Sequence, residues 1–114
     1  TLLADVKPSM EIATQEVFGP VLTLEAVNSI EEALQLINQP QYGLTAAIFS
    51  NRLDIVGKFV DGVQSGMVHV NHGTSPESHM PFGGVKSSQI GPGSVGSLTK
   101  DFFTGVKSVY IRYS

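Results

Sequence analysis

The stretch that decides the fold is "VLTLEAVNSIEEALQLINQPQYGLTAAIFS", Val21–Ser50, in which the spacing of apolar residues changes twice. Its first seven residues, Val21–Val27, are rich in aliphatic side chains and have the length of a β-strand. Ser29 and Glu32 then have the spacing of a helix capping box. The apolar residues that follow have the helical spacing of one buried face, and they are Ile30, Ala33, Leu34 and Ile37.

The same alternation continues beyond this helix, which Pro40 and Gly43 end. "LTAAIFS", Leu44–Ser50, predicts a second strand, and Asn51 is placed to cap a second helix that Gly66 terminates. The apolar stripe of that helix is Leu53, Val56, Val60 and Val63. "MVHVN", Met67–Asn71, predicts a third strand. The order β-α-β-α-β predicts an α/β fold with a three-layer parallel sheet, in which ligands bind at the carboxyl ends of the strands.

The flanking segments are less regular. Before Val21 we expect only a short strand at Leu2–Ala4 and an irregular lead-in. After Asn71 comes a stretch rich in glycine, proline and serine that reaches Gly96 and is long for a compact domain. A short helix at about Leu98–Phe103 and a last strand at Val106–Tyr113 complete the prediction.

Composition excludes several classes of function. Only 15% of the 114 residues are charged, against about 25% in a typical soluble domain, so part of the surface is expected to be an interface. The net charge of -3 excludes a basic nucleic-acid surface. The absence of cysteine excludes disulfides and a thiol nucleophile from this chain. No apolar run approaches the roughly 20 residues of a membrane helix, and we expect a soluble, cytoplasmic protein.

Several motifs suggest a role in binding or catalysis, and each of them also has a simpler structural explanation. In "TQEVFGPV", Thr14–Val21, Glu16 is either a ligand-binding carboxylate or a solvated charge, and Phe18 is either a ligand contact or a core residue. "GPGSVG", Gly91–Gly96, matches the G-x-G-x-x-G pattern of a phosphate loop. No strand is predicted before it, and Pro92 lacks an amide donor, which favours a plain flexible loop.

Histidines are common metal ligands, and the chain has three of them. His69 lies within the third predicted strand, and alternation places Met67 and Asn71 on its face rather than His72. We therefore expect no histidine trio with His79. Ser75 and Ser78 lack the context of a nucleophilic serine. "MPFGGVKSS", Met80–Ser88, is more specific, because two adjacent glycines allow a sharp turn and a close backbone approach.

The segments "QEVFGPV", "YGLTAAIFS", "GMVHVN" and "NHGTSPESHMPFGGVKSS", in this order and spacing, resemble the C-terminal part of the NAD(P)-dependent aldehyde dehydrogenase superfamily. The resemblance covers essentially the whole chain. It implies that residues 1–105 are part of the catalytic domain and that residues 106–114 form a terminal oligomerisation strand, which joins the sheet of a neighbouring subunit in a homo-oligomer.

The resemblance also implies the roles of site residues. Glu16 would accept hydrogen bonds from both hydroxyls of the nicotinamide-side ribose of NAD or NADP. Phe18 would form one side of the site that holds the nicotinamide ring. A carboxylate suits this role because it has two acceptor oxygens. Four residues of the loop from His72 to Phe82 would shape the aldehyde entrance, and they are His72, Thr74, Pro76 and Phe82.

The chain departs from the family pattern at Gln89, where glycine is common, and at Pro92-Gly93, where an Arg-Glu pair is common. The nucleophilic cysteine, the general-base glutamate, the oxyanion-holding asparagine and the Rossmann-type domain all lie upstream of the matched region. The resemblance therefore implies a fragment of an aldehyde-oxidising enzyme that is inactive alone and has no catalytic residue of its own. The alternatives are a non-catalytic interaction or assembly module of the same fold and, last, a small nucleotide-binding domain.

Overall fold

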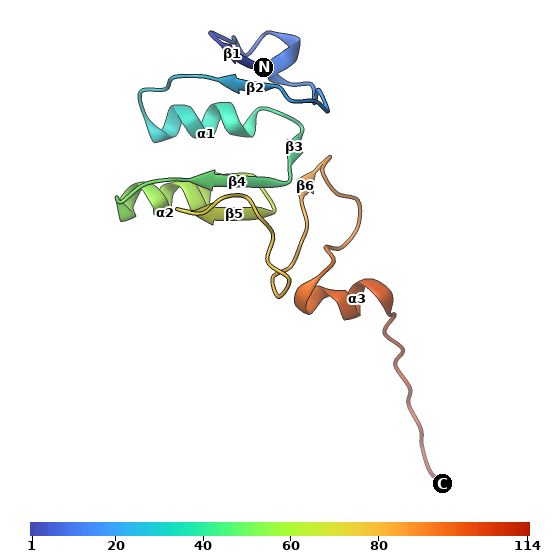
Figure 1. Cartoon of the computed structure of the whole chain (residues 1–114). Helices are drawn as coiled ribbons and strands as arrows, with labels where there is room; N and C mark the ends of the chain where they lie inside the picture. Colours follow the sequence, from blue (N-terminus) through green and yellow to red (C-terminus); the bar gives the residue numbers. More distant parts are fainter.

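The computed structural model describes all residues from Thr1 to Ser114. Its secondary structure is a series of short elements strung along an elongated molecule, with extents of 75 × 33 × 23 Å (Figure 1). The strands are β1 (Leu2–Ala4), β2 (Leu22–Leu24), β3 (Tyr42–Gly43), β4 (Thr45–Ile48), β5 (Met67–Val70) and β6 (Val85–Lys86). The helices are α1 (Ile30–Asn38), α2 (Leu53–Gly62) and α3 (Thr99–Phe103), with short 3-10 turns at Glu11–Ala13 and Gly96–Leu98.

The strands form three separate two-stranded sheets, and this corrects the predicted three-layer sheet. β1 pairs with β2 in parallel, β3 with β6 antiparallel, and β4 with β5 in parallel. The β-α-β-α-β order is confirmed, but only β4 and β5 share a sheet, joined through α2. The spacing of apolar residues predicts where strands lie but not which strands pair. In the structure β2 pairs with β1, and Leu2 lies opposite Leu22. Figure 1 shows α1 between the β1-β2 and β4-β5 pairs.

Helix α1 begins as predicted. The Ser29 hydroxyl accepts a hydrogen bond from the Glu32 amide at 3.1 Å. The Glu32 carboxylate accepts one from the Asn28 amide at 2.8 Å, one residue earlier than in an ideal capping box. The bond to Ser29 satisfies an amide that the first turn of a helix otherwise leaves without a partner, and the bond from Asn28 fixes the residue just before the helix.

Helix α2 corrects three predictions. It begins at Leu53 after Arg52, and the Arg52 amide donates to the Ser50 hydroxyl, so Asn51 does not cap it. It ends at Gly62, before Val63, so Gly66 does not terminate it. The predicted apolar stripe is also displaced, since Phe59 is buried at 5% exposure. Leu53, which lies in the first turn, is 86% exposed.

Glycines allow the segments to approach closely at the start of β5. A Cβ atom on Gly66 would meet the Gly83 carbonyl oxygen and would lie 2.7 Å from the Gly84 Cα. A Cβ atom on Gly43 would meet the Gln64 carbonyl oxygen. The double glycine of "MPFGGVKSS" therefore does make the close backbone approach that the sequence predicted.

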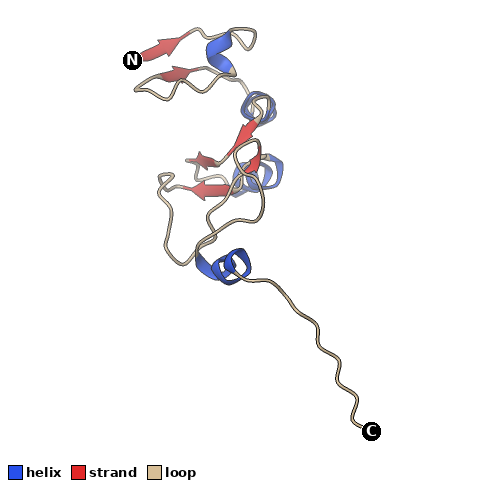
Figure 2. Ribbon diagram, turned by 90° about the vertical axis from the view of Figure 1, so that its right-hand side faces the viewer, coloured by secondary structure: helices blue, strands red, loops and turns tan.

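The C-terminal residues match their prediction in the helix but form no strand within the chain. The helix expected at about Leu98–Phe103 is confirmed as a 3-10 turn followed by α3. Val106–Tyr113 forms no strand within the chain, because no segment lies beside it to complete a ladder. Figure 2 shows this tail running away from α3. Its apolar side chains are exposed, with Tyr110 at 94% and Tyr113 at 88%.

The three helices are all shorter and more polar than a helix that crosses a bilayer.

The Gly66 contact predicts the effect of a single methyl group. Gly66→Ala would push a Cβ atom into the backbone of the Gly83-Gly84 turn, and overpacking of this kind costs about 1–3 kcal/mol in the free energy of unfolding. Gly57→Ala is the matched control, because Gly57 lies in α2 with nothing within 4 Å of its added Cβ. We expect it to stabilise by up to about 1 kcal/mol. Urea-unfolding midpoints would measure both, and equal midpoints would contradict the proposed collision.

Candidate functional site

The loop between the first 3-10 turn and β2 presents Glu16 and Phe18 to solvent. Glu16 is exposed, and its carboxylate forms no hydrogen bond or ion pair within the chain. Phe18 is 92% exposed and has a φ of 54°. A bulky residue is strained in this left-handed region, so the loop holds the ring outward at a conformational cost. Phe18 therefore packs into no core within this chain.

A cavity of about 520 Å³, the Glu16 cavity, joins this loop to the β3–β6 ribbon. The part of its wall that comes from outside the loop combines hydroxyl-bearing and apolar side chains. Its lining residues are Glu16, Ile37, Pro40, Tyr42, Gly43, Leu44, Thr45, Ser65, Ser87 and Ser88. Sequence reasoning found only Glu16 among them. The serines were missed because an isolated hydroxyl carries no spacing signal.

A second cavity of about 770 Å³, the His69 cavity, lies along β5 and the loop that follows it. Of the predicted aldehyde-entrance residues, His72 and Pro76 line it. Thr74 is exposed and Phe82 half-buried, and neither contributes to its wall. The remaining lining residues are Gly66, Met67, Val68, His69, Glu77, His79, Met80 and Pro81.

The structure brings two histidines together that strand alternation had separated. The rings of His69 and His72 stack with centroids 5.7 Å apart and an interplanar angle of 17°. Asn71, with a φ of 53°, turns the chain back after β5 and so places His72 beside His69. The Nε2 atom of His69 is buried without a hydrogen-bond partner. No set of three His, Asp or Glu side chains is grouped closely enough to hold a metal ion.

Gln89, one of the departures from the family pattern, supports the turn beside the cavities. Its side-chain oxygen accepts a hydrogen bond from the Gly84 amide at 2.7 Å, and its nitrogen donates to the Gly91 carbonyl at 2.9 Å. The Ser88 hydroxyl accepts from the Gly43 amide at 2.9 Å. Gln89 therefore ties the double-glycine turn to the segment that follows β6, and Ser88 ties that segment to β3.

The Gly91–Gly96 segment does not have the setting of a phosphate loop. It follows a turn rather than a strand, and Ser94 forms an antiparallel bridge with Phe82. The helix beyond it, α3, has five residues. This arrangement lacks the strand-loop-helix context that a dinucleotide fingerprint needs, which removes the observation behind the small nucleotide-binding domain.

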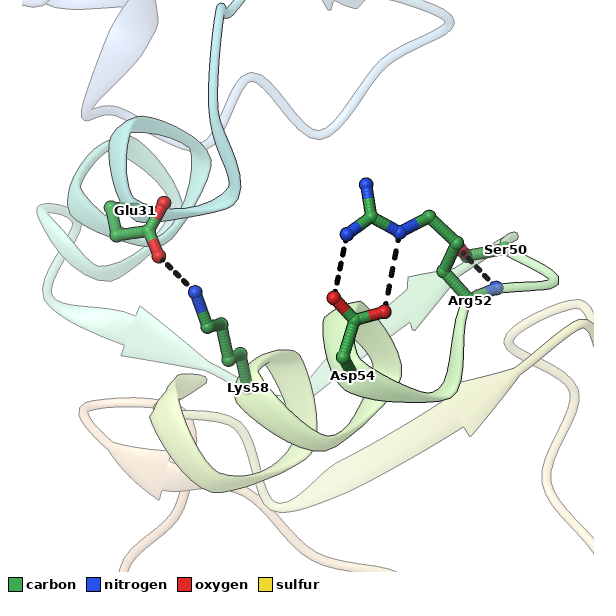
Figure 3. Close-up of polar contacts among 5 residues, drawn as sticks. All are labelled: Glu31, Ser50, Arg52, Asp54 and Lys58. Atoms are coloured by element: carbon green, nitrogen blue, oxygen red, sulfur yellow. Dashed lines mark hydrogen bonds and ion pairs between the residues drawn. The ribbon is translucent and has the colours of Figure 1, made fainter.

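Figure 3 shows the two ion pairs of the chain, and none of their residues lines either cavity. Lys58 of α2 contacts Glu31 of α1 at 2.7 Å, and Arg52 contacts Asp54 at 2.6 Å. The hydrogen bond from Lys58 lowers the pKa of the Glu31 carboxyl, and that from Arg52 lowers the pKa of the Asp54 carboxyl. Both pairs are exposed, so solvent screens them and they stabilise the fold little. The Glu31–Lys58 pair links α1 to α2, whereas the Arg52–Asp54 pair lies within the start of α2.

Comparison with known proteins places this geometry in a family. The sequence model of the aldehyde dehydrogenase family matches residues 1–109. An alpha-ketoglutaric semialdehyde dehydrogenase of Bacillus subtilis is 39% identical over 109 residues, which are 95% of this chain and 22% of the relative. A succinate-semialdehyde dehydrogenase [NADP(+)] of Deinococcus radiodurans is 43% identical over 91 residues, 80% of this chain and 19% of the relative.

Solved structures agree. An indole-3-acetaldehyde dehydrogenase of P. syringae, in complex with NAD+, matches with a TM-score of 0.91 and 33% identity, over 98% of this chain and 22% of that one. A lactaldehyde dehydrogenase matches with a TM-score of 0.79 and 32% identity, over 84% of this chain and 20% of that one. The chain thus spans about a fifth of the length of these proteins. From its sequence motifs, its fold and these matches, the chain belongs to the aldehyde dehydrogenase family.

Proposed function

We propose that the chain is the part of an NAD(P)-dependent aldehyde dehydrogenase that holds the nicotinamide side of the cofactor and shapes the aldehyde entrance. The observation that carries the proposal is the Glu16–Phe18 loop, in which an unpartnered carboxylate stands beside a phenyl ring held outward at a φ of 54°. Strain of this kind persists where function requires the conformation. Several relatives and structural neighbours have NAD(+) or NADP(+) in their descriptions.

Glu16 is suited to the ribose because a carboxylate can accept a hydrogen bond from each of two vicinal hydroxyls. Phe18 offers an apolar face that limits where the nicotinamide ring can lie. NAD or NADP, when bound, accepts the hydride that leaves the aldehyde carbon. The contribution of Glu16 and Phe18 is to hold the acceptor in position for that transfer.

On the aldehyde side, His72 and Pro76 line the His69 cavity and are proposed to contact or admit substrate. Phe82 and Thr74 belong to the same loop and complete the proposed entrance. The cavity wall combines imidazole, proline and methionine side chains with a single carboxylate, Glu77. The relatives act on aldehydes as different as semialdehydes and benzaldehyde, so the proposal extends to aldehydes as a class.

The chain does not supply the chemistry of bond formation. It has no cysteine, so a thiolate nucleophile of the kind the family resemblance implies must come from another part of the enzyme. A non-catalytic interaction or assembly module of the same fold is the second candidate. The observation that favours it is the large set of exposed apolar side chains, including the tail from Val106 to Tyr113.

The 114-residue chain alone is expected to form no NADH or NADPH with any aldehyde, because it contains neither thiolate nor positioned general base. Absorbance at the reduced-cofactor band, with purified chain and a panel of semialdehydes and benzaldehyde, measures this. A signal that disappears in Glu16→Gln would contradict the proposal that the nucleophile comes from another part of the enzyme.

In a complete dehydrogenase subunit that contains residues 1–114, Glu16→Gln is expected to slow hydride transfer or weaken cofactor affinity by roughly tenfold to a hundredfold. A hydrogen bond to a charged group contributes about 1.5–3 kcal/mol, and each 1.4 kcal/mol is tenfold. Glu25→Gln is the matched control, since Glu25 is exposed and lies outside the Glu16 cavity. Single-turnover kinetics would detect the loss, and an unchanged rate would identify Glu16 as a solvated charge.

The tail, Val106–Tyr113, is proposed to pair with a sheet of another subunit. It has apolar residues on both faces and only Lys107 and Arg112 as charges, and an extended segment of this kind invites strand addition. Sedimentation of the chain with and without residues 106–114, at several concentrations, tests the proposal. We expect self-association only when the tail is present. If both versions of the chain sediment as monomers, the proposed interface is wrong.

A further inference from the structure

The loop from His72 to Phe82, called the entrance loop below, is not held by its own contacts. Residues 72 to 80 are all exposed and form no helix or strand. The hydrogen bonds within it are local, from the Met80 amide to the Glu77 carbonyl at 3.1 Å and between His72 Nδ1 and the Gly73 carbonyl oxygen at 2.6 Å. Outside these bonds, the His79-Met80 backbone packs against Gly96, and Phe82 and Ser94 exchange backbone hydrogen bonds of 2.8 and 2.9 Å. The position of the exposed part over the His69 cavity therefore also depends on the segments that flank the loop.

At the first end, Asn71 joins the loop to β4. Its side-chain oxygen accepts a hydrogen bond from the Ser50 amide at 2.8 Å, and its side-chain nitrogen donates to the Ser50 carbonyl at 3.0 Å. Its own amide donates to the Ile48 carbonyl at 2.8 Å. The Asn71 side chain thus continues the β4–β5 pairing by one residue, while its φ of 53° turns the backbone out of the strand.

Beyond the other end, four residues after Phe82, Lys86 of β6 joins the chain to α1. Its Nζ atom donates to the carbonyl oxygens of Asn38 at 2.8 Å and of Pro40 at 3.0 Å. A cation is favourable at this place because the C-terminus of a helix carries partial negative charge. The Asn38 side chain in turn donates to the Gly62 carbonyl and accepts from the Gln64 amide, both at 2.8 Å.

Lys86 and Asn71 share one further property. Five residues other than glycine have a positive φ, and these two bracket the entrance loop. Both make side-chain hydrogen bonds to backbone of another element, which offsets the strain of the left-handed conformation. Neither lines the His69 cavity, so neither is placed to touch an aldehyde.

We propose that Asn71 and Lys86 are positioning residues that hold the two ends of the entrance loop and thereby set aldehyde affinity. This inference rests on the proposed function of the loop. Because the two side chains act through the position of the loop rather than on reacting atoms, their loss removes binding shared by the ground state and the transition state. Such a loss raises KM for the aldehyde and leaves kcat nearly unchanged.

Glycine variants separate the side-chain bonds from the backbone conformation. Asn71→Gly and Lys86→Gly keep the positive φ without strain and delete only the bonds to Ser50, Asn38 and Pro40. Asn51→Gly is the control, since Asn51 is exposed and makes no side-chain hydrogen bond. Lys86→Arg keeps a cationic donor and is expected to restore most of the affinity.

The variants are placed in residues 1–114 substituted for the matching segment of the Bacillus subtilis relative, with NAD+ and with alpha-ketoglutaric semialdehyde or benzaldehyde as probes. We expect the KM for the aldehyde to rise at least fivefold in both anchor variants. The KM for NAD+ and kcat are expected to stay within about twofold to threefold. An unchanged aldehyde KM, or equal rises in both KM values, would overturn the proposal.

Hydrogen exchange of the 114-residue chain gives a readout that needs no activity. Both anchor variants are expected to accelerate exchange of the hydrogen-bonded Met80 and Phe82 amides relative to Asn51→Gly, with no change in α2. If the unsubstituted chimera folds but forms no NADH, the proposed function fails. Exchange in residues 72–82 that both glycine variants leave unchanged overturns the anchoring proposal itself.

Discussion

The contact between the Gly83-Gly84 turn and Gly66 is the constraint on which the rest of the site depends. At this point two backbones lie closer than any side chain would permit, which seats the β3–β6 ribbon against the beginning of β5. The Glu16 cavity lies on the ribbon, and the His69 cavity lies along β5. A change in this one contact would therefore alter the relation between the proposed cofactor side and the proposed aldehyde side.

The hydrophobic core of the chain is small. Val6, Ala46 and Phe59 are its buried apolar side chains, whereas Leu22, Phe49 and Leu53 are mostly exposed. The Cα radius of gyration is 18.8 Å, and a compact domain of this length has about 13 Å. These features fit a segment that spans about a fifth of its relatives, because the same apolar surfaces would be covered by further parts of the family fold.

Local patterns predicted the elements better than their partners. Ser29 and Glu32 fixed the start of α1 because capping depends on residues a few positions apart. The pairing of β1 with β2 could not be foreseen, since nothing in the spacing of Leu22–Leu24 names a neighbour. In the site, the motif around Glu16 was recognisable. The stacking of His72 on His69 was not, because it depends on the left-handed turn at Asn71.

Two hydrogen bonds, one beside the β4–β5 pair and one beside the β3–β6 ribbon, bear on the order in which the site assembles. The bond between Ser50 and Asn71 closes 21 residues, while that between Gly43 and Ser88 closes 45. Loop closure costs entropy in proportion to the logarithm of length, so the longer closure costs about 0.6 kcal/mol more. We expect β4 and β5 to associate first during folding and the β3–β6 ribbon to follow. The proposed cofactor side, which lies on the β3–β6 ribbon, would then be the last part of this segment to become ordered and the first to open when the protein is stressed.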